Sequence, residues 1–279
     1  MKTVESIADL REARAKLAET VGFVPTMGFL HEGHISLVKI AKQRCNSVVV
    51  SIFVNPSQFG PNEDLDAYPR DLPSDLALLE EAGVDLVWLP TPEIMYPANY
   101  QTWINLEEIT QPLEGAKRPG HFRGVATVVA KLFNAVQADV AVFGQKDAQQ
   151  VAVIKQMVRD LNFPLEILVG PIIREADGLA KSSRNTYLKV DERQAATVLS
   201  RALKAADAAF AEGERSGDAI RAIMQVTIES EALARLEYVS CADPITLVEL
   251  ESIENQALLS MAVFVGKTRL IDNLVLGKE

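Results

Sequence analysis

The chain has 279 residues, of which 48% are hydrophobic, so it is long enough to form one large domain or two ordinary ones around a sizeable core. Its formal net charge of −10 argues against broad binding to nucleic acids or to anionic membranes. No apolar run approaches the length of a bilayer-spanning helix, and the first residues lack the pattern of a signal peptide. The two cysteines form no disulfide framework, so we expect a cytoplasmic protein.

The first 170 or so residues alternate between short β-rich runs and segments with helical periodicity. The predicted strands cover residues 21–24, 47–54, 84–89, 139–143 and 165–169. The predicted helices cover residues 35–44, 72–82, 124–136 and 148–161. Buried strands joined by helices predict an α/β fold with a parallel sheet, in which ligands bind beyond the carboxyl ends of the strands.

The pattern changes after residue 174. Residues 191–213 predict one long Ala-rich helix and residues 218–234 a second, before strand-like runs at 236–240, 258–265 and 268–276. We therefore predict a Rossmann-like domain over residues 1–175 and a smaller α+β domain over residues 176–279, with the boundary near residues 175–178.

The most informative stretch covers residues 25–34, where a predicted strand gives way to a predicted helix through His31, Gly33 and His34. The first N–H groups of a helix have no intrahelical partner, and the helix dipole adds positive charge there, which suits a phosphate. Gly28 and Gly33 allow the backbone to approach a ligand closely. The two imidazoles supply further donors, so the stretch favours a nucleotide phosphate site.

Two other interpretations of the histidines remain open. Histidines at this spacing also occur as zinc ligands, or as hydrogen-bonded structural residues. The remaining histidine is His121, and Cys45 and Cys241 stand alone without a Cys-x-x-Cys pattern. The spacing of the glycines serves phosphate binding alone, so we prefer that interpretation.

Polar residues also follow other predicted strands. Asn55 and Gln58 offer amides for substrate hydroxyl, carboxylate or amine groups, although Asn-Pro-Ser is also ordinary turn chemistry. Lys146 lies where a strand-end lysine reaches a phosphate, and Asp147 suits a helix cap, a ribose or Mg²⁺. Cationic clusters at residues 117–123 and 180–185 are either anion sites or exposed basic loops.

Other nucleotide motifs are missing from the sequence. Gly266, Lys267 and Thr268 imitate the end of a Walker loop, but Met261 stands where the first glycine is required. No Gly-x-Gly-x-x-Gly occurs, and no Ser-His-Asp or Cys-His pairing has a recognisable local context.

Taken together, these segments resemble the pantoate–β-alanine ligases, a family of the nucleotidyltransferase-like superfamily with His-x-Gly-His. The matching segments are residues 25–34, 50–60, 68–70, 120–125, 143–150 and 177–185. The resemblance implies a ligase that couples (R)-pantoate to β-alanine with ATP and Mg²⁺, through a pantoyl-adenylate, and releases AMP and pyrophosphate. It also implies a homodimer.

The resemblance assigns roles to individual residues. His34 would be the general acid and His31 its phosphate-binding companion, with Lys146 and Arg184 as the other catalytic residues. The residues expected to bind ATP are Met27, Gly28, Phe29, Leu30, His31, Glu32, Gly33, His34, Gly144, Gln145, Lys146, Asp147, Ile173, Lys181, Ser182, Ser183 and Arg184. Gln58 and Gln150 would bracket pantoate, and Asn55 and Gln58 would contact β-alanine. The pantoate pocket near His121 would be lined by Val125, Val128 and Val129. Asp75 is the candidate Mg²⁺ ligand.

One position departs from the family, which usually carries Met where this chain has Lys181. Two other functions remain as alternatives. An adenylyltransferase of the same superfamily would retain AMP in its product, but Asn55, Gln58 and Gln150 suit a small carboxylate pocket instead. A nucleotide-sensing module without catalysis would not need His34 or Arg184.

Overall fold

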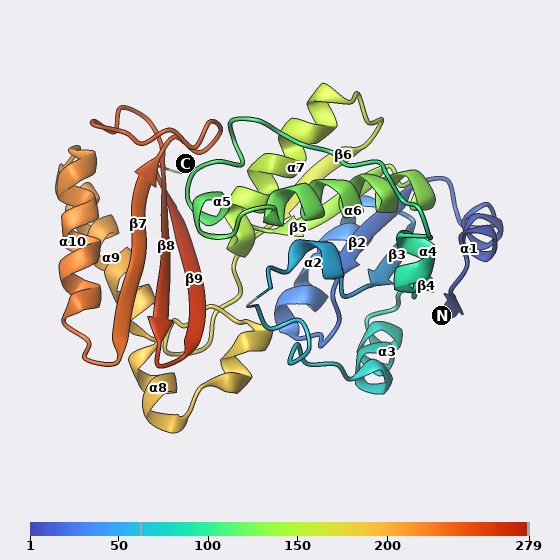
Figure 1. Cartoon of the computed structure of the whole chain (residues 1–279), viewed down its shortest axis with the longest axis horizontal. Helices are drawn as coiled ribbons and strands as arrows, with labels where there is room; N and C mark the ends of the chain where they lie inside the picture. Colours follow the sequence, from blue (N-terminus) through green and yellow to red (C-terminus); the bar gives the residue numbers. More distant parts are fainter. Residues whose placement is uncertain (62, 278–279) are drawn as a thin grey trace. The chain divides into compact units, whose positions relative to one another are not determined.

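The computed structural model describes residues 1–61 and 63–277 (Figure 1). The chain divides into two compact units, the first made of residues 1–144 and 153–171, and the second of residues 145–152 and 172 onward. Among the described residues, no helix combines the length and the apolar character that crossing a membrane requires.

The first unit contains a six-stranded sheet in the order β1-β4-β3-β2-β5-β6, and every neighbouring pair is parallel. Its strands are β1 (Lys2–Val4), β2 (Val21–Thr26), β3 (Ser47–Ile52), β4 (Leu86–Trp88), β5 (Val140–Gly144) and β6 (Glu166–Gly170). The chain proceeds from β2 toward one edge and from β5 toward the other. The strand order therefore reverses between β2 and β5, the position at which open α/β sheets bind ligands.

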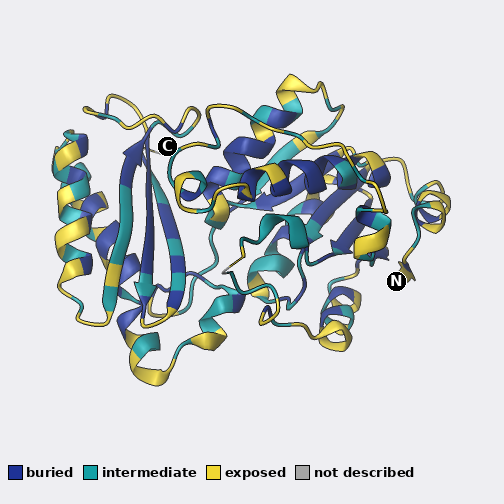
Figure 2. Cartoon of the chain, viewed as in Figure 1, coloured by how far each residue is buried: buried dark blue, intermediate teal, exposed yellow. Residues whose placement is uncertain are grey.

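Helices pack against this sheet, and the buried side chains of helices and strands together form its hydrophobic core. They are α1 (Ile7–Arg14), α2 (Glu32–Arg44), α3 (Leu72–Glu81), α4 (Pro92–Met95), α5 (Glu114–Lys117) and α6 (His121–Val136), while α7 (Ala148–Asp160) begins in the second unit and continues in the first. Leu37 and Ala41 of α2 and Leu79 of α3 pack into one cluster with Val24 and Val142 of the sheet. The buried strands and helix faces appear in dark blue in Figure 2.

The second unit has an antiparallel sheet in the order β7-β8-β9, formed by β7 (Ala234–Ala242), β8 (Ala257–Val265) and β9 (Thr268–Leu276). Its helices are α8 (Val190–Ala195), α9 (Val198–Ala211) and α10 (Gly217–Glu229). Leu199 and Leu203 of α9, Ile220 and Met224 of α10, and Met261 of β8 share one buried cluster. This cluster gives the second unit a hydrophobic core of its own.

The predicted fold class is confirmed, but several elements differ from the prediction. The single helix expected over 191–213 is two helices, α8 and α9. At the break, the Thr197 and Leu199 N–H groups make shorter i→i−3 bonds and the Thr197 hydroxyl donates to the Gln194 carbonyl. The helix expected over 218–234 ends at Glu229, and β7 begins at Ala234. The strand β1 and helix α1 were not predicted.

The predicted domain division at residue 175 stays a prediction. In the structure, the first compact unit ends earlier, at residue 171, and residues 145–152 belong to the second unit. Those eight residues include Lys146 and Asp147, so part of the predicted ATP-binding set belongs to the unit that contains the antiparallel sheet.

Candidate active site

The loop between β2 and α2 is held in an unusual backbone conformation by a buried carboxylate. Gly28 and Phe29 both have positive φ, at 82° and 50°. Asp75, which is 2% exposed on α3, accepts the N–H of Phe29 at 2.9 Å and that of Leu30 at 2.6 Å. Successive N–H groups in left-handed backbone form an anion-binding concavity, so the Asp75 carboxylate fixes this loop from inside the protein.

Gly28 lies directly against the Asp75 carboxylate. A Cβ on Gly28 would lie 3.0 Å from Asp75 Oδ2, so a larger residue is opposed by both φ and space. Burial raises the pKa of Asp75, although the two backbone bonds act in the opposite direction. The role of Asp75 as a Mg²⁺ ligand stays a prediction. Within the part of the chain that the structure describes, no group of three or more His, Cys, Asp or Glu residues is arranged to hold a metal.

Both histidines of the loop take part in capping α2. His31 is the N-cap residue, and its Nδ1 accepts the Gly33 N–H at 3.1 Å. His34 Nδ1 accepts the His31 N–H at 3.2 Å, and the two rings lie 4.1 Å apart. Because each Nδ1 is an acceptor, the hydrogen of each neutral ring lies on Nε2. The turn therefore holds two imidazoles in one tautomer with Nε2–H as the donor.

Gly33 is required because of space and not because of a positive φ. A Cβ on Gly33 would lie 2.8 Å from His31 Cε1, closer than real side chains approach. Gly33 therefore leaves the space that the His31 ring fills.

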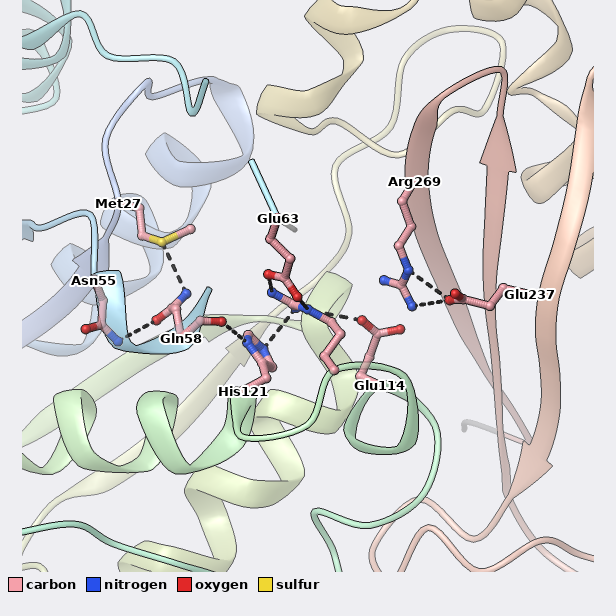
Figure 3. A network of polar contacts seen from close by, with 9 residues as sticks. Met27, Asn55, Gln58, Glu63, Glu114, His121, Glu237 and Arg269 are labelled. Atoms are coloured by element: carbon pink, nitrogen blue, oxygen red, sulfur yellow. Dashed lines mark hydrogen bonds and ion pairs between the residues drawn. The ribbon is translucent and has the colours of Figure 1, made fainter. Parts of the chain in front are cut away.

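A second group of polar residues follows β3 in the short helix η1 (Pro56–Gln58). Asn55 is 1% exposed, and its Oδ1 accepts hydrogen bonds from the Ser57 N–H and from the Tyr96 hydroxyl. Its Nδ2 donates to Gln58 Oε1 at 3.0 Å, and Gln58 Nε2 lies 3.2 Å from Met27 Sδ (Figure 3). Asn55 thus orients the Gln58 amide, while the predicted contact of Asn55 with β-alanine stays a prediction.

His121, at the start of α6, supports Gln58 from the other side. His121 Nδ1 donates to the Gln58 carbonyl at 2.8 Å, and its Nε2 accepts from Arg118 Nη1 at 3.0 Å, since a guanidinium has donors only (Figure 3). Burial, reinforced by the Arg118 charge, lowers the pKa of His121 to about 4. His121 is therefore neutral at physiological pH, with both ring nitrogens engaged by the protein.

Two further residues fix this part of the first unit. Glu63 binds the Arg118 guanidinium in a bidentate pair, at 2.8 and 2.6 Å. A Cβ on Gly124 would lie 2.4 Å from the Ser57 carbonyl oxygen, so only glycine lets α6 approach η1 this closely. Val125, Val128 and Val129 are buried on α6. Their predicted role in lining the pantoate pocket, like the substrate contact of His121, stays a prediction.

In the second unit, the remaining ATP-binding candidates lie in two segments. The turn η2 (Gln145–Asp147) carries Lys146 and leads into α7. Ile173 accepts the Lys181 N–H through its carbonyl, and Ser182 Oγ accepts the Arg184 N–H at the start of η3 (Ser183–Tyr187). Lys181 Nζ lies 3.7 Å from Glu175 Oε1.

Gln58 and Gln150 belong to different units. Their predicted joint role in binding pantoate therefore stays a prediction.

Comparison with known proteins decides the family. The family model described as pantoate-beta-alanine ligase matches residues 2–275. The chain belongs to the pantoate–β-alanine ligase family. The pantothenate synthetase of Herpetosiphon aurantiacus is 59% identical over 277 residues, which cover 99% of this chain and 100% of that protein. The pantothenate synthetase of Roseiflexus sp. strain RS-1 is 60% identical over 276 residues, 99% of each chain.

Solved structures of the family share the whole fold. The crystal structure of pantothenate synthetase from Thermus thermophilus matches with a TM-score of 0.94 and 48% identity, covering 98% of this chain and 99% of that one. The pantoate–β-alanine ligase of Francisella tularensis, solved in complex with beta-gamma ATP and beta-alanine, matches with a TM-score of 0.83 and 35% identity, covering 100% and 99%. The predicted resemblance to the pantoate–β-alanine ligases is thereby confirmed.

The sequence did not reveal the residues that hold the family-motif residues in position. Arg118 was noted only as part of a cationic cluster; it is the C-cap residue of α5 and His121 begins α6, so no helical spacing links the two residues. Tyr96, whose hydroxyl contacts Asn55, and Asn273, on β9, carried no local signal at all.

Proposed function

We propose that this member of the pantoate–β-alanine ligase family activates (R)-pantoate as a pantoyl-adenylate at the loop between β2 and α2. The ligation of pantoate and β-alanine is the reaction of the family to which the chain belongs. The observation that carries our proposal is the anchoring of His31 and His34, whose Nδ1 atoms both accept backbone N–H groups and leave Nε2 as the donor. The relative from Francisella tularensis, with ATP and β-alanine in its complex, supports the same ligands here.

The chemistry has two steps. A carboxylate oxygen of pantoate attacks the α-phosphorus of ATP, the bond from that phosphorus to the bridging oxygen breaks, and pyrophosphate leaves. The neutral amine of β-alanine then attacks the acyl carbon of the mixed anhydride, and AMP leaves with the former carboxylate oxygen. Neither step needs a covalent bond to the enzyme, which agrees with the lack of a recognisable activated Ser or Cys in the sequence.

The proposed roles of the loop residues follow from their donors. Nε2–H of His34 donates a hydrogen bond to the phosphate oxygens that gain charge as the α-phosphorus is attacked and as pyrophosphate departs. The general-acid role expected from the resemblance would need a ring protonated on both nitrogens, whereas Nδ1 of His34 accepts the His31 N–H. His31 donates from Nε2 to the same phosphate chain. Donors whose direction is fixed before the reaction stabilise developing charge without reorganisation, which is the advantage of imidazoles already anchored at Nδ1.

The remaining roles are proposed from the resemblance. Lys146 and Arg184 neutralise phosphate charge, and Arg184 makes the bidentate contacts that a lysine cannot make. Gln58 and Gln150 bind pantoate and hold its carboxylate for attack, which supplies the entropic advantage of orientation. Asp147 binds the ribose, and Ile173 lies beside the adenine.

We propose that Mg²⁺ enters with ATP as part of the substrate and offsets charge on the phosphates. Among the described residues, no group of three or more His, Cys, Asp or Glu residues is arranged to hold a metal. Asp75 already accepts two backbone N–H groups, and no step of our mechanism passes through it. We also propose a homodimer that acts in the cytoplasm and binds neither nucleic acid nor membranes.

One experiment separates the ligase from the two alternatives. The chain is supplied with ATP, pantoate and hydroxylamine, without β-alanine. A ligase that forms a pantoyl-adenylate produces pantoyl-hydroxamate and AMP. An adenylyltransferase that retains AMP in its product produces no hydroxamate, and a nucleotide sensor produces neither compound, so either of those results would refute the proposal.

A further inference from the structure

The turn that carries Lys146 is anchored within the second unit by one side chain of β9. Asn273 Nδ2 donates to the Gln145 carbonyl at 3.0 Å and to the Lys146 carbonyl at 2.9 Å. Asn273 Oδ1 accepts from Gln145 Nε2 at 3.1 Å. One amide therefore makes three hydrogen bonds to two consecutive residues that precede it by 127 and 128 positions in the sequence.

The anchoring amide is itself rigidly placed. Asn273 is 3% exposed, and it lies in the middle of a regular antiparallel register, opposite Ser260 of β8. A side chain on a packed strand has few rotamers available, so its amide is already oriented when the turn contacts it. The Lys146 backbone is thus held by a strand and not by a neighbouring loop.

Asp272, the residue before Asn273, contacts the second segment of this unit in which ATP-binding residues are predicted, residues 173–184. The buried Asp272 forms a bidentate pair with the partly exposed Arg174, at 2.7 and 2.9 Å, and Arg174 also donates to the Gly178 carbonyl at 3.0 Å. Arg174 follows Ile173, whose carbonyl accepts the Lys181 N–H. Two consecutive residues of β9 therefore contact both segments in which the second unit carries its predicted ATP-binding residues.

We propose that Asn273 is a positioning residue for ATP activation, which sets the direction of the Lys146 ammonium by fixing the backbone of its turn. This inference rests on the proposed role of Lys146 in binding the phosphates. An amide is needed at this position because the turn presents two carbonyl acceptors and one side-chain donor. Aspartate has the size of asparagine but has no donor, so it would place its oxygens against two carbonyl oxygens.

A double-mutant cycle on the full chain tests the proposal. Pantoyl-hydroxamate formation is measured for Asn273→Ala, Lys146→Met and the double variant, with kcat and the KM values for ATP and pantoate. We expect Asn273→Ala to lower kcat/KM for ATP by about tenfold to a hundredfold while the KM for pantoate changes by less than about twofold. In the Lys146→Met background, the same substitution should cost less than about threefold, because the group that it positions is already gone.

Two further variants keep the result interpretable. Ser240→Ala is the matched control, because Ser240 is buried in the same sheet and its Oγ has no hydrogen-bond partner among the described residues. We expect it to leave kcat/KM for ATP unchanged. If Asn273→Ala loses its folded circular dichroism spectrum, Asn273→Ser replaces it in the cycle, because a hydroxyl is neutral and introduces no charge into this buried site.

The outcomes are distinct. Full additivity of Asn273 and Lys146 substitutions, or an equal loss in the KM for pantoate, would overturn the positioning role and leave the proposed function intact. An active Lys146→Met variant would contradict the proposed role of Lys146, and the inference about Asn273 would fail with it. Weakened ATP binding with unchanged adenosine binding in Asn273→Ala would support the inference, because Lys146 is proposed to contact phosphate only.

Discussion

The His31–His34 loop and the Gln145–Asp147 turn are both proposed to bind phosphate, but the protein holds them by different means. In the loop, the histidines are anchored by backbone N–H groups within three residues, and Asp75 contributes from α3. The turn is anchored by Asn273, from the last strand of the chain. The loop is therefore fixed largely by its own sequence, whereas the turn depends on the folding of the second unit.

Substitutions in the loop and substitutions that affect the turn should therefore lower activity in different ways. A change in the loop removes a reacting group or its immediate support, and the damage should be confined to ATP chemistry. A change that affects the turn acts through packing in a sheet, and it should alter catalysis only through Lys146. The following predictions test how far each part of the site depends on its own supports.

The largest effect is expected from His34→Ala. The substitution removes a donor to developing phosphate charge, and the loss of one such preorganised donor typically costs about 10²- to 10³-fold. Pantoyl-hydroxamate formation should fall by that factor, while thermal unfolding shows that the chain remains folded. A folded variant with near-normal turnover would refute the role of His34.

The lowered pKa of His121 predicts that the stability of the protein depends on pH. The unfolded chain takes up a proton on His121 below about pH 6.5, whereas the folded chain keeps the ring neutral until about pH 4. The free energy of unfolding should therefore fall as the pH falls through this window, by a total of roughly 3 kcal/mol, and level off below it.

The matched variant is His121→Asn, which retains a donor toward the Gln58 carbonyl but cannot titrate. Urea unfolding of both proteins at several pH values measures the difference between their stabilities. That difference should change between about pH 6.5 and 4 and be constant above about pH 7. Parallel curves across the whole range would show that His121 is not held neutral.

Gly124→Ala should displace the backbone of Gln58, because its Cβ would meet the Ser57 carbonyl at 2.4 Å. Overpacking of this kind lowers folding stability by about 1–3 kcal/mol, and the displaced Gln58 should weaken the binding of pantoate more than that of ATP. Gly60→Ala is the control, since its Cβ would meet nothing closer than 3.6 Å. Titration calorimetry with pantoate and with ATP distinguishes the two ligands, and an equal loss of both would place the disturbance elsewhere.

The smallest effect is expected from Lys181→Met, which restores the residue usual in the family. Lys181 lies near Glu175 and is a flexible point charge, so its removal should lower adenylation only slightly, and less at high ionic strength. Arg184→Met should be far more damaging. If both variants lose activity equally, an essential phosphate contact of this chain lies on Lys181.

The sequence predicted what depends on local patterns. Alternating strands and helices identified the parallel sheet, and His31, Gly33 and His34 marked the phosphate loop, because capping and glycine requirements are local. Short elements such as β1 escaped detection, since three residues carry too little periodicity. The split between α8 and α9 escaped detection because the residues at the break, Ala196 and Thr197, are neither glycine nor proline.

The supports of the site were beyond sequence reasoning for a different physical reason. Asp75 was singled out as a carboxylate that could bind Mg²⁺, but its partners are backbone N–H groups that any sequence would possess. Asn273 was not singled out, because nothing near it in the sequence indicates that its amide contacts residues 145 and 146. Such pairings are determined by the folded topology, not by spacing along the chain.

The most direct test of the central claim follows the oxygen atoms of pantoate. The chain is incubated with ATP, β-alanine and pantoate labelled with ¹⁸O in its carboxylate, and AMP and pyrophosphate are examined by mass spectrometry. If a pantoyl-adenylate forms, AMP gains one ¹⁸O atom and pyrophosphate gains none, because the attacking oxygen leaves with AMP. Label in pyrophosphate or inorganic phosphate, or unlabelled AMP, would contradict the account.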